Sequence, residues 1–177
     1  RRAGRVDAME RFGNETEEAC REAMKEVPDS AEPHYRLGRI YRALMKDDEA
    51  LVEQERALAK DPRYGPARYE RVVLATQQYR KRIRNFLDRI GWEFQSPTGS
   101  PPLKDLLKND AETQVLLNRI EADLRETSGL PPGAAACAEG MYAWVIGEKE
   151  KARERLVTAV SSDPNLEEGY EVLATLE

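Results

Sequence analysis

One stretch of the chain, from Glu32 to Pro62, constrains its fold more than any other part of the sequence. Small or apolar residues recur in it at positions spaced for two short helices, and a proline closes it. Glycine and alanine let two helices approach closely, and proline cannot continue a helix because it lacks a backbone N–H. The stretch therefore predicts a tightly packed helix pair. The positions that define the pattern are Leu37, Gly38, Tyr41, Ala50, Ala57 and Pro62.

This spacing resembles the tetratricopeptide repeat (TPR), whose pattern is W-x2-L-G-x2-Y, then A-x3-F, then P. His34 stands where that family usually has Trp, and Gln54 stands where it has a large apolar residue. The resemblance implies an all-α fold, a right-handed helical solenoid of antiparallel helix pairs that binds proteins on its concave surface. The side chains expected on the buried side of the first helix are Leu37, Tyr41, Leu44 and Met45.

The pattern recurs 102 residues later, measured from Pro62 to Pro164. The matching positions in the second copy are Gly140, Gly147, Ala152, Leu156, Ala159 and Pro164. Glu139 replaces the leucine before the first glycine, so the first half of this copy has diverged more. A further or closing helix is expected over 166–177, with Asn165 in a capping box and Tyr170 and Leu173 turned inward.

Residues 1–30 read as a diverged or truncated repeat, with a turn at Gly13–Asn14 before a helix that stops at Pro28. Together with a clear repeat over 31–64 and a second over 133–165, they predict a single TPR-like domain spanning residues 1–177.

The region 65–127 is predicted to form an atypical long helical hairpin with a loop at 91–102. Apolar residues form one helical stripe from Ala67 to Ile90, which favours a single helix ending at Gly91. A shorter hairpin with a turn at Gln77–Gln78 is the alternative. After the loop, Asn109 and Glu112 suit a capping box within the second helix.

Composition and chain ends set further bounds. Charged residues make up 34% of the chain and hydrophobic residues 40%, which suits thin helical layers. No apolar run approaches the roughly 18 residues that a membrane span requires.

Cys20 and Cys137 lack metal-ligand spacing, so we expect them to be packing residues in a reducing, cytoplasmic-type compartment. The chain starts at Arg1, and Glu177 falls within a helical pattern, so we expect a fragment of a longer protein.

The first candidate site is the outer stripe of the clear repeat's first helix, formed by Tyr35, Arg39 and Arg42. A guanidinium is a planar fork of donors that stacks on aromatic rings and suits carboxylates or an acidic peptide. An ordinary solvated helix face is the alternative. TPR domains that clamp a carboxylate use Lys and Asn side chains, so the resemblance transfers no residue set here.

The corresponding stripe of the second repeat contains Cys137, Met141 and Trp144. If it is open, it forms an apolar contact surface with Met141 and Trp144 as partner-binding residues. The alternative is that the central hairpin covers this stripe within the chain.

A third candidate is the basic helix over residues 63–90, whose charge concentrates at Arg80, Lys81, Arg82 and Arg84. Such a helix could bind an acidic partner, an anionic membrane surface or RNA. Its cations spread over several faces, which favours internal pairing over nucleic-acid binding.

No catalytic residue, cofactor or metal site is predicted. His34 occupies a packing position, and Asp47, Asp48 and Glu49 suit the first turn of a helix. The leading hypothesis is a non-catalytic protein-interaction scaffold that binds a protein or peptide, with a regulatory or docking appendage of a larger enzyme, such as a bacterial signalling kinase, as the alternative. Homo-oligomerisation through terminal helices is also consistent with the pattern. Terminal repeats normally need a polar outer face, and a terminal helix without one could pair with another copy of the chain.

Overall fold

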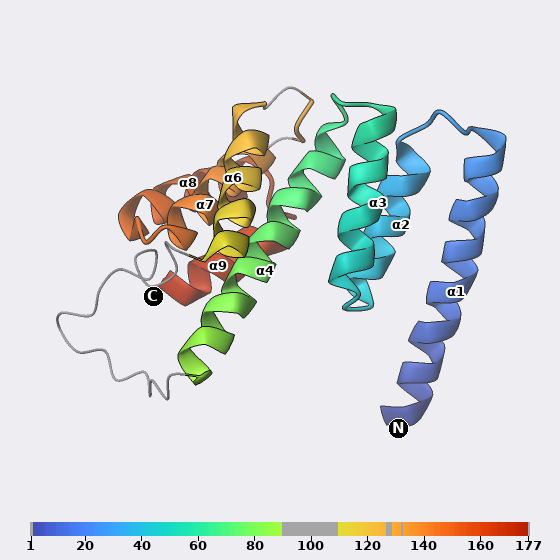
Figure 1. Cartoon of the computed structure of the whole chain (residues 1–177), viewed down its shortest axis with the longest axis horizontal. Helices are drawn as coiled ribbons and strands as arrows, with labels where there is room; N and C mark the ends of the chain where they lie inside the picture. Colours follow the sequence, from blue (N-terminus) through green and yellow to red (C-terminus); the bar gives the residue numbers. More distant parts are fainter. Residues whose placement is uncertain (1, 90–109, 127–128, 132, 177) are drawn as a thin grey trace. The chain divides into compact units, whose positions relative to one another are not determined.

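A computed structural model describes residues 2–89, 110–126, 129–131 and 133–176. All regular secondary structure in these ranges is helical (Figure 1). The helices in chain order are α1 (Arg2–Glu26), α2 (Glu32–Ala43), α3 (Asp47–Lys60), α4 (Gly65–Arg89), α6 (Ala111–Arg125), α7 (Ala134–Val145), α8 (Lys149–Ser162) and α9 (Glu167–Leu176). Among them, none has both the length and the apolar character needed to cross a bilayer. The predicted all-α class is confirmed.

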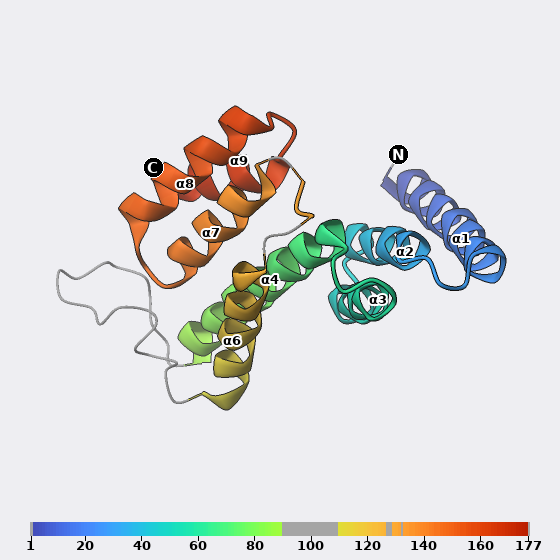
Figure 2. The same cartoon turned by 90° about the horizontal axis from the view of Figure 1, so that it is seen from above.

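The chain divides into two compact units, Arg1–Leu74 and Ala75–Glu177, with the boundary inside α4. In the first unit α2 packs against both α1 and α3. In the second unit α7 and α8 form a pair, α9 packs on both of them, and α6 contacts α7 (Figure 2). The pairs α2–α3 and α7–α8 are the helix pairs predicted from the two copies of the pattern, so TPR-like helix pairs are present in both units.

Each helix pair has one glycine in its first helix where the second helix comes too close for a side chain. We call these positions, Gly38 and Gly140, glycine notches. A Cβ atom placed on Gly38 would lie 2.3 Å from Gln54 Nε2 and 3.1 Å from the backbone oxygen of Ala50. A Cβ atom placed on Gly140 would lie 2.6 Å from Leu156 Cγ. Gln54 and Leu156 stand 102 residues apart and are both fully buried. The two pairs therefore pack in the same way, with a polar side chain filling the first notch and an apolar one filling the second.

The long central helix is confirmed as one uninterrupted element, α4, so no turn occurs at Gln77–Gln78. The predicted helix end at Gly91 and the loop at 91–102 lie outside the described residues. The predicted cap was wrong in position, because Asp110 rather than Asn109 caps α6. The Asp110 carboxylate accepts a hydrogen bond from the Thr113 backbone N–H at 2.9 Å, which satisfies a free donor of the first turn.

Three other expectations are corrected. Residues Gly13–Asn14 form no turn, because α1 runs through them, and a Cβ atom on Gly13 would lie 3.1 Å from Leu44 Cδ1. This glycine therefore serves close helix packing. Met45 is 83% exposed, because it lies in the turn after α2. Tyr170 points outward at 49% exposure, while Val172 takes the buried position on α9.

Met45 has a backbone φ of 60°, which is left-handed and costs a non-glycine residue about 1–2 kcal/mol. The residue 102 positions later is Gly147, with a φ of 88°. We therefore expect Met45→Gly to raise the free energy of unfolding by about 1 kcal/mol, after the entropy that glycine adds to the unfolded chain. Urea unfolding measures the change. Met45→Ala retains the strain, so an equal gain in that variant would show that backbone conformation is not the cause.

Candidate partner-binding site

The predicted stripe on α2 is held by a carboxylate that the sequence did not point to. Arg39 Nε lies 3.4 Å from Glu70 Oε1, and Arg42 Nε lies 3.2 Å from Glu70 Oε2. Glu70 comes from the first part of α4, in the same unit, and its side chain is only 5% exposed. The arginine side chains are 56% and 21% exposed, respectively. One buried carboxylate therefore positions two guanidinium groups that reach the surface.

Aromatic rings complete this surface. The Arg39 guanidinium lies 6.0 Å from the centroid of the Tyr35 ring, and Tyr35 meets Tyr64 edge to face with centroids 5.5 Å apart. The Tyr64 hydroxyl donates a hydrogen bond to the Glu32 carboxylate, which lowers the pKa of that carboxyl group. Burial raises the pKa of the Tyr35 hydroxyl. Tyr35 and Arg39 are thus held in a defined orientation on α2.

The equivalent positions in the second unit are apolar. Arg39, Arg42 and Glu70 correspond, 102 residues later, to the apolar residues Met141, Trp144 and Val172. Met141 is only 2% exposed, which corrects its assignment as a partner-binding residue. Cys137 is also buried, because α7 packs against α6, α8 and α9. Cys137 and Met141 are therefore buried within the chain, as the alternative hypothesis predicted, whereas Trp144 is only half-buried.

Trp144 is half-buried, and its ring is covered by an arginine of α4. The guanidinium carbon of Arg80 lies 4.4 Å from the centroid of the indole ring. Cation–π contacts of this geometry are favourable, particularly where water is partly excluded. One member of the basic helix therefore contacts the second repeat directly.

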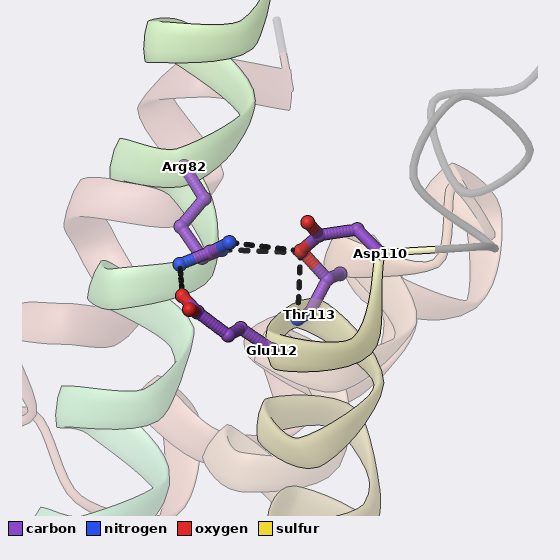
Figure 3. A network of polar contacts seen from close by, with 4 residues as sticks. All are labelled: Arg82, Asp110, Glu112 and Thr113. Carbon is purple, nitrogen blue, oxygen red and sulfur yellow. Dashed lines mark hydrogen bonds and ion pairs between the residues drawn. The ribbon is translucent and has the colours of Figure 1, made fainter.

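The other cations of the basic helix have different environments. Arg82 pairs with the carboxylates of Asp110, at 2.9 Å, and Glu112, and the Thr113 hydroxyl donates to the same Asp110 carboxylate (Figure 3). This network joins α4 to the start of α6. Lys81 and Arg84 are exposed. The basic residues therefore do not form one continuous cationic surface.

Side chains that suit catalysis have structural roles. His34 Nδ1 lies 2.8 Å from Glu53 Oε2, so the histidine joins α2 to α3. Asp47, Asp48 and Glu49 occupy the first turn of α3, where negative charge favours the helix dipole. Across the described ranges, no group of three or more potential metal ligands comes together. The guanidinium groups of Arg39 and Arg42 on α2 are donors of the kind that form charge-assisted hydrogen bonds.

Neither the scan against protein-family models nor the search of curated proteins gives a match. Among solved structures, the chain is similar to a tetratricopeptide repeat protein from Parabacteroides merdae ATCC 43184, with 17% identity over 98% of this chain and 81% of that chain, at a TM-score of 0.37. It is also similar to the APC/C hetero-tetramer Cut9–Hcn1, with 13% identity over 93% of this chain and 39% of that chain, at a TM-score of 0.30.

The chain is TPR-like in its repeat spacing and its helix pairs. This description rests on the packing of α2 with α3 and of α7 with α8. With TM-scores below 0.5, the two similar structures add nothing to the assignment of a site or a partner.

Proposed function

We propose that this chain is a non-catalytic protein-interaction module that binds an acidic segment of a partner on the exposed face of α2. The proposal rests on the environment of the Arg39 side chain. More than half of its side chain is open to solvent, yet Glu70 and Tyr35 hold it in place. A positioned guanidinium loses less side-chain entropy on binding than a freely rotating one, so more of its contact energy appears as affinity.

The donors on this surface support an acidic partner. The guanidinium groups of Arg39 and Arg42 both lie next to the Glu70 carboxylate, and more than half of the Arg39 side chain is exposed. The neighbouring ion pair of Arg36 with Glu32 at 2.6 Å is neutral overall. Complementary charge steers encounter and selects partners. The alternative hypothesis is a docking appendage of a larger enzyme. Such an appendage would bind its partner through the same face, so the same binding experiment applies to it.

Arg39→Ala is expected to weaken binding of a fluorescein-labelled, glutamate-rich peptide about tenfold, because it removes the most exposed of the positioned cations. Fluorescence anisotropy at low salt measures the dissociation constant.

Arg56→Ala is a matched control on α3. Arg56 is 60% exposed and pairs with Glu53, a carboxylate that is 6% exposed and is also contacted by His34. Each alanine variant removes one exposed arginine and leaves a buried carboxylate with another partner. Equal weakening by the two variants would show that the peptide responds only to net charge, and would remove α2 as the site.

A further inference from the structure

The second unit contains a partly buried guanidinium, Arg80, that forms no ion pair with any residue that the structure describes. The guanidinium of Arg80 lies over the Trp144 ring. Within the described residues, its donor groups make no hydrogen bond or ion pair. This is the opposite of Arg82, two residues along α4, which pairs with Asp110 and Glu112. Stacking uses the face of the guanidinium and leaves the donors at its edge available.

A second cation lies next to this one. Arg84 is one turn further along α4, on the same helix face, and is exposed. Burial, and then the charge of Arg84, lower the pKa of the Arg80 guanidinium, while Glu171 on α9 acts in the opposite direction more weakly. Arginine still remains charged at neutral pH. Arg84 therefore adds a second positive charge close to the Arg80 guanidinium, and Glu171 is a carboxylate that opposes it more weakly.

We propose that Arg80 and Arg84, beside Trp144, form a binding site for a phosphate monoester dianion, as presented by a phosphorylated peptide or by free phosphate. A monoester carries about −1.5 to −2 charges at pH 7 and three acceptor oxygens, which matches two adjacent guanidinium forks. The site is separate from Arg39 on α2 and does not depend on the proposed function of that face.

The surroundings favour a monoester over a nucleic-acid backbone. Each phosphodiester carries a single charge, so RNA needs a track of cations along its length. Arg82 is taken up by Asp110 and Glu112, and Lys81 is rotated about 100° around the helix from Arg80. The two available guanidinium groups therefore form a local site rather than a track.

The test uses the fluorescence of Trp144 in a Trp92→Phe background, which leaves one tryptophan in the full chain. A phosphoserine peptide, its unphosphorylated form and inorganic phosphate are titrated separately at low ionic strength. We expect the phosphorylated peptide to bind at least about tenfold more tightly than the unphosphorylated one. Inorganic phosphate that binds as tightly as the phosphopeptide would identify the free ion as the ligand.

Variants locate the site. Arg80→Gln and Arg84→Gln should each weaken phosphopeptide binding about tenfold. If circular dichroism shows that Arg80→Gln does not fold, Arg84→Gln still tests the site, because Arg84 is exposed. Lys81→Gln makes the same charge change one residue away and should alter affinity less than about twofold. Glu171→Gln should strengthen binding about twofold, because it removes a competing negative charge. Equal affinity for the two peptides, equal loss in Lys81→Gln, or tighter binding of single-stranded RNA would overturn the proposal.

Discussion

Replacing Leu156 with alanine is expected to lower the free energy of unfolding of the second unit by about 3–4 kcal/mol. Leu156 is fully buried, and its Cγ atom fills the notch left by Gly140. Glycine has no side chain that could move into the space, so the cavity should persist between α7 and α8. A large cavity is what raises the cost of a leucine-to-alanine change above the transfer free energy alone. Urea unfolding followed by far-ultraviolet circular dichroism measures the loss.

Val157→Ala is the control for this experiment. Val157 is the next residue on α8 and is 49% exposed, so its truncation should change the free energy of unfolding by no more than about 0.5 kcal/mol. A loss below about 1 kcal/mol for Leu156→Ala would mean that the α7–α8 contact collapses around the smaller side chain. The glycine notch would then not be the rigid feature described above.

The helix pairs could be predicted from the sequence because their contacts depend on local, strict requirements. Gly38 and Gly140 leave no room for a Cβ atom, and α3 and α8 each contribute fully buried alanines. The alanines that are fully buried in the two pairs are Ala50, Ala57, Ala152 and Ala159. Substitution at such positions changes helix separation, so the pattern of small residues is itself a structural signal. Tyr41 is a weaker case, since it is half-buried and donates to Glu17 Oε1 at 3.0 Å.

Other features were ambiguous for physical reasons. Glycine serves both turns and close packing, and nothing near Gly13 distinguishes the two uses before α2 is known to approach α1. Met45 follows the apolar spacing of α2, but the helix ends at Ala43, so helical periodicity no longer applies to it. Tyr170 and Val172 differ by two positions, and a small shift in the start of α9 decides which one turns inward.

The candidate site on α2 could also be predicted from the sequence only in part. Arg39 and Arg42 could be predicted as surface residues from their helical spacing with Tyr35. Glu70 could not be assigned to them, because it belongs to α4, which the sequence presents as a basic helix. A comparison of the two repeats contains a usable signal, since Glu70 stands where the later copy has the buried Val172. A charged residue at a buried position implies partners of opposite charge.

The double variant Arg39→Ala, Arg42→Ala is expected to lower the free energy of unfolding by about 3–5 kcal/mol, because it removes two guanidinium partners of a buried carboxylate. Adding Glu70→Val should recover most of that loss, since valine is the residue that the second unit packs at the equivalent position. Chemical denaturation of the double and triple variants measures both steps.

Binding by the triple variant separates the two roles of the ion-paired residues. If the arginines on α2 serve recognition, the triple variant should be folded and yet fail to bind the glutamate-rich peptide. Retained binding would place the acidic partner elsewhere, and a failure of Glu70→Val to restore stability would show that Glu70 does more than balance these two charges. Because the second unit folds with apolar residues at all three positions, packing alone does not require the charges of the first. Recognition of a partner is the reason that we propose for their presence.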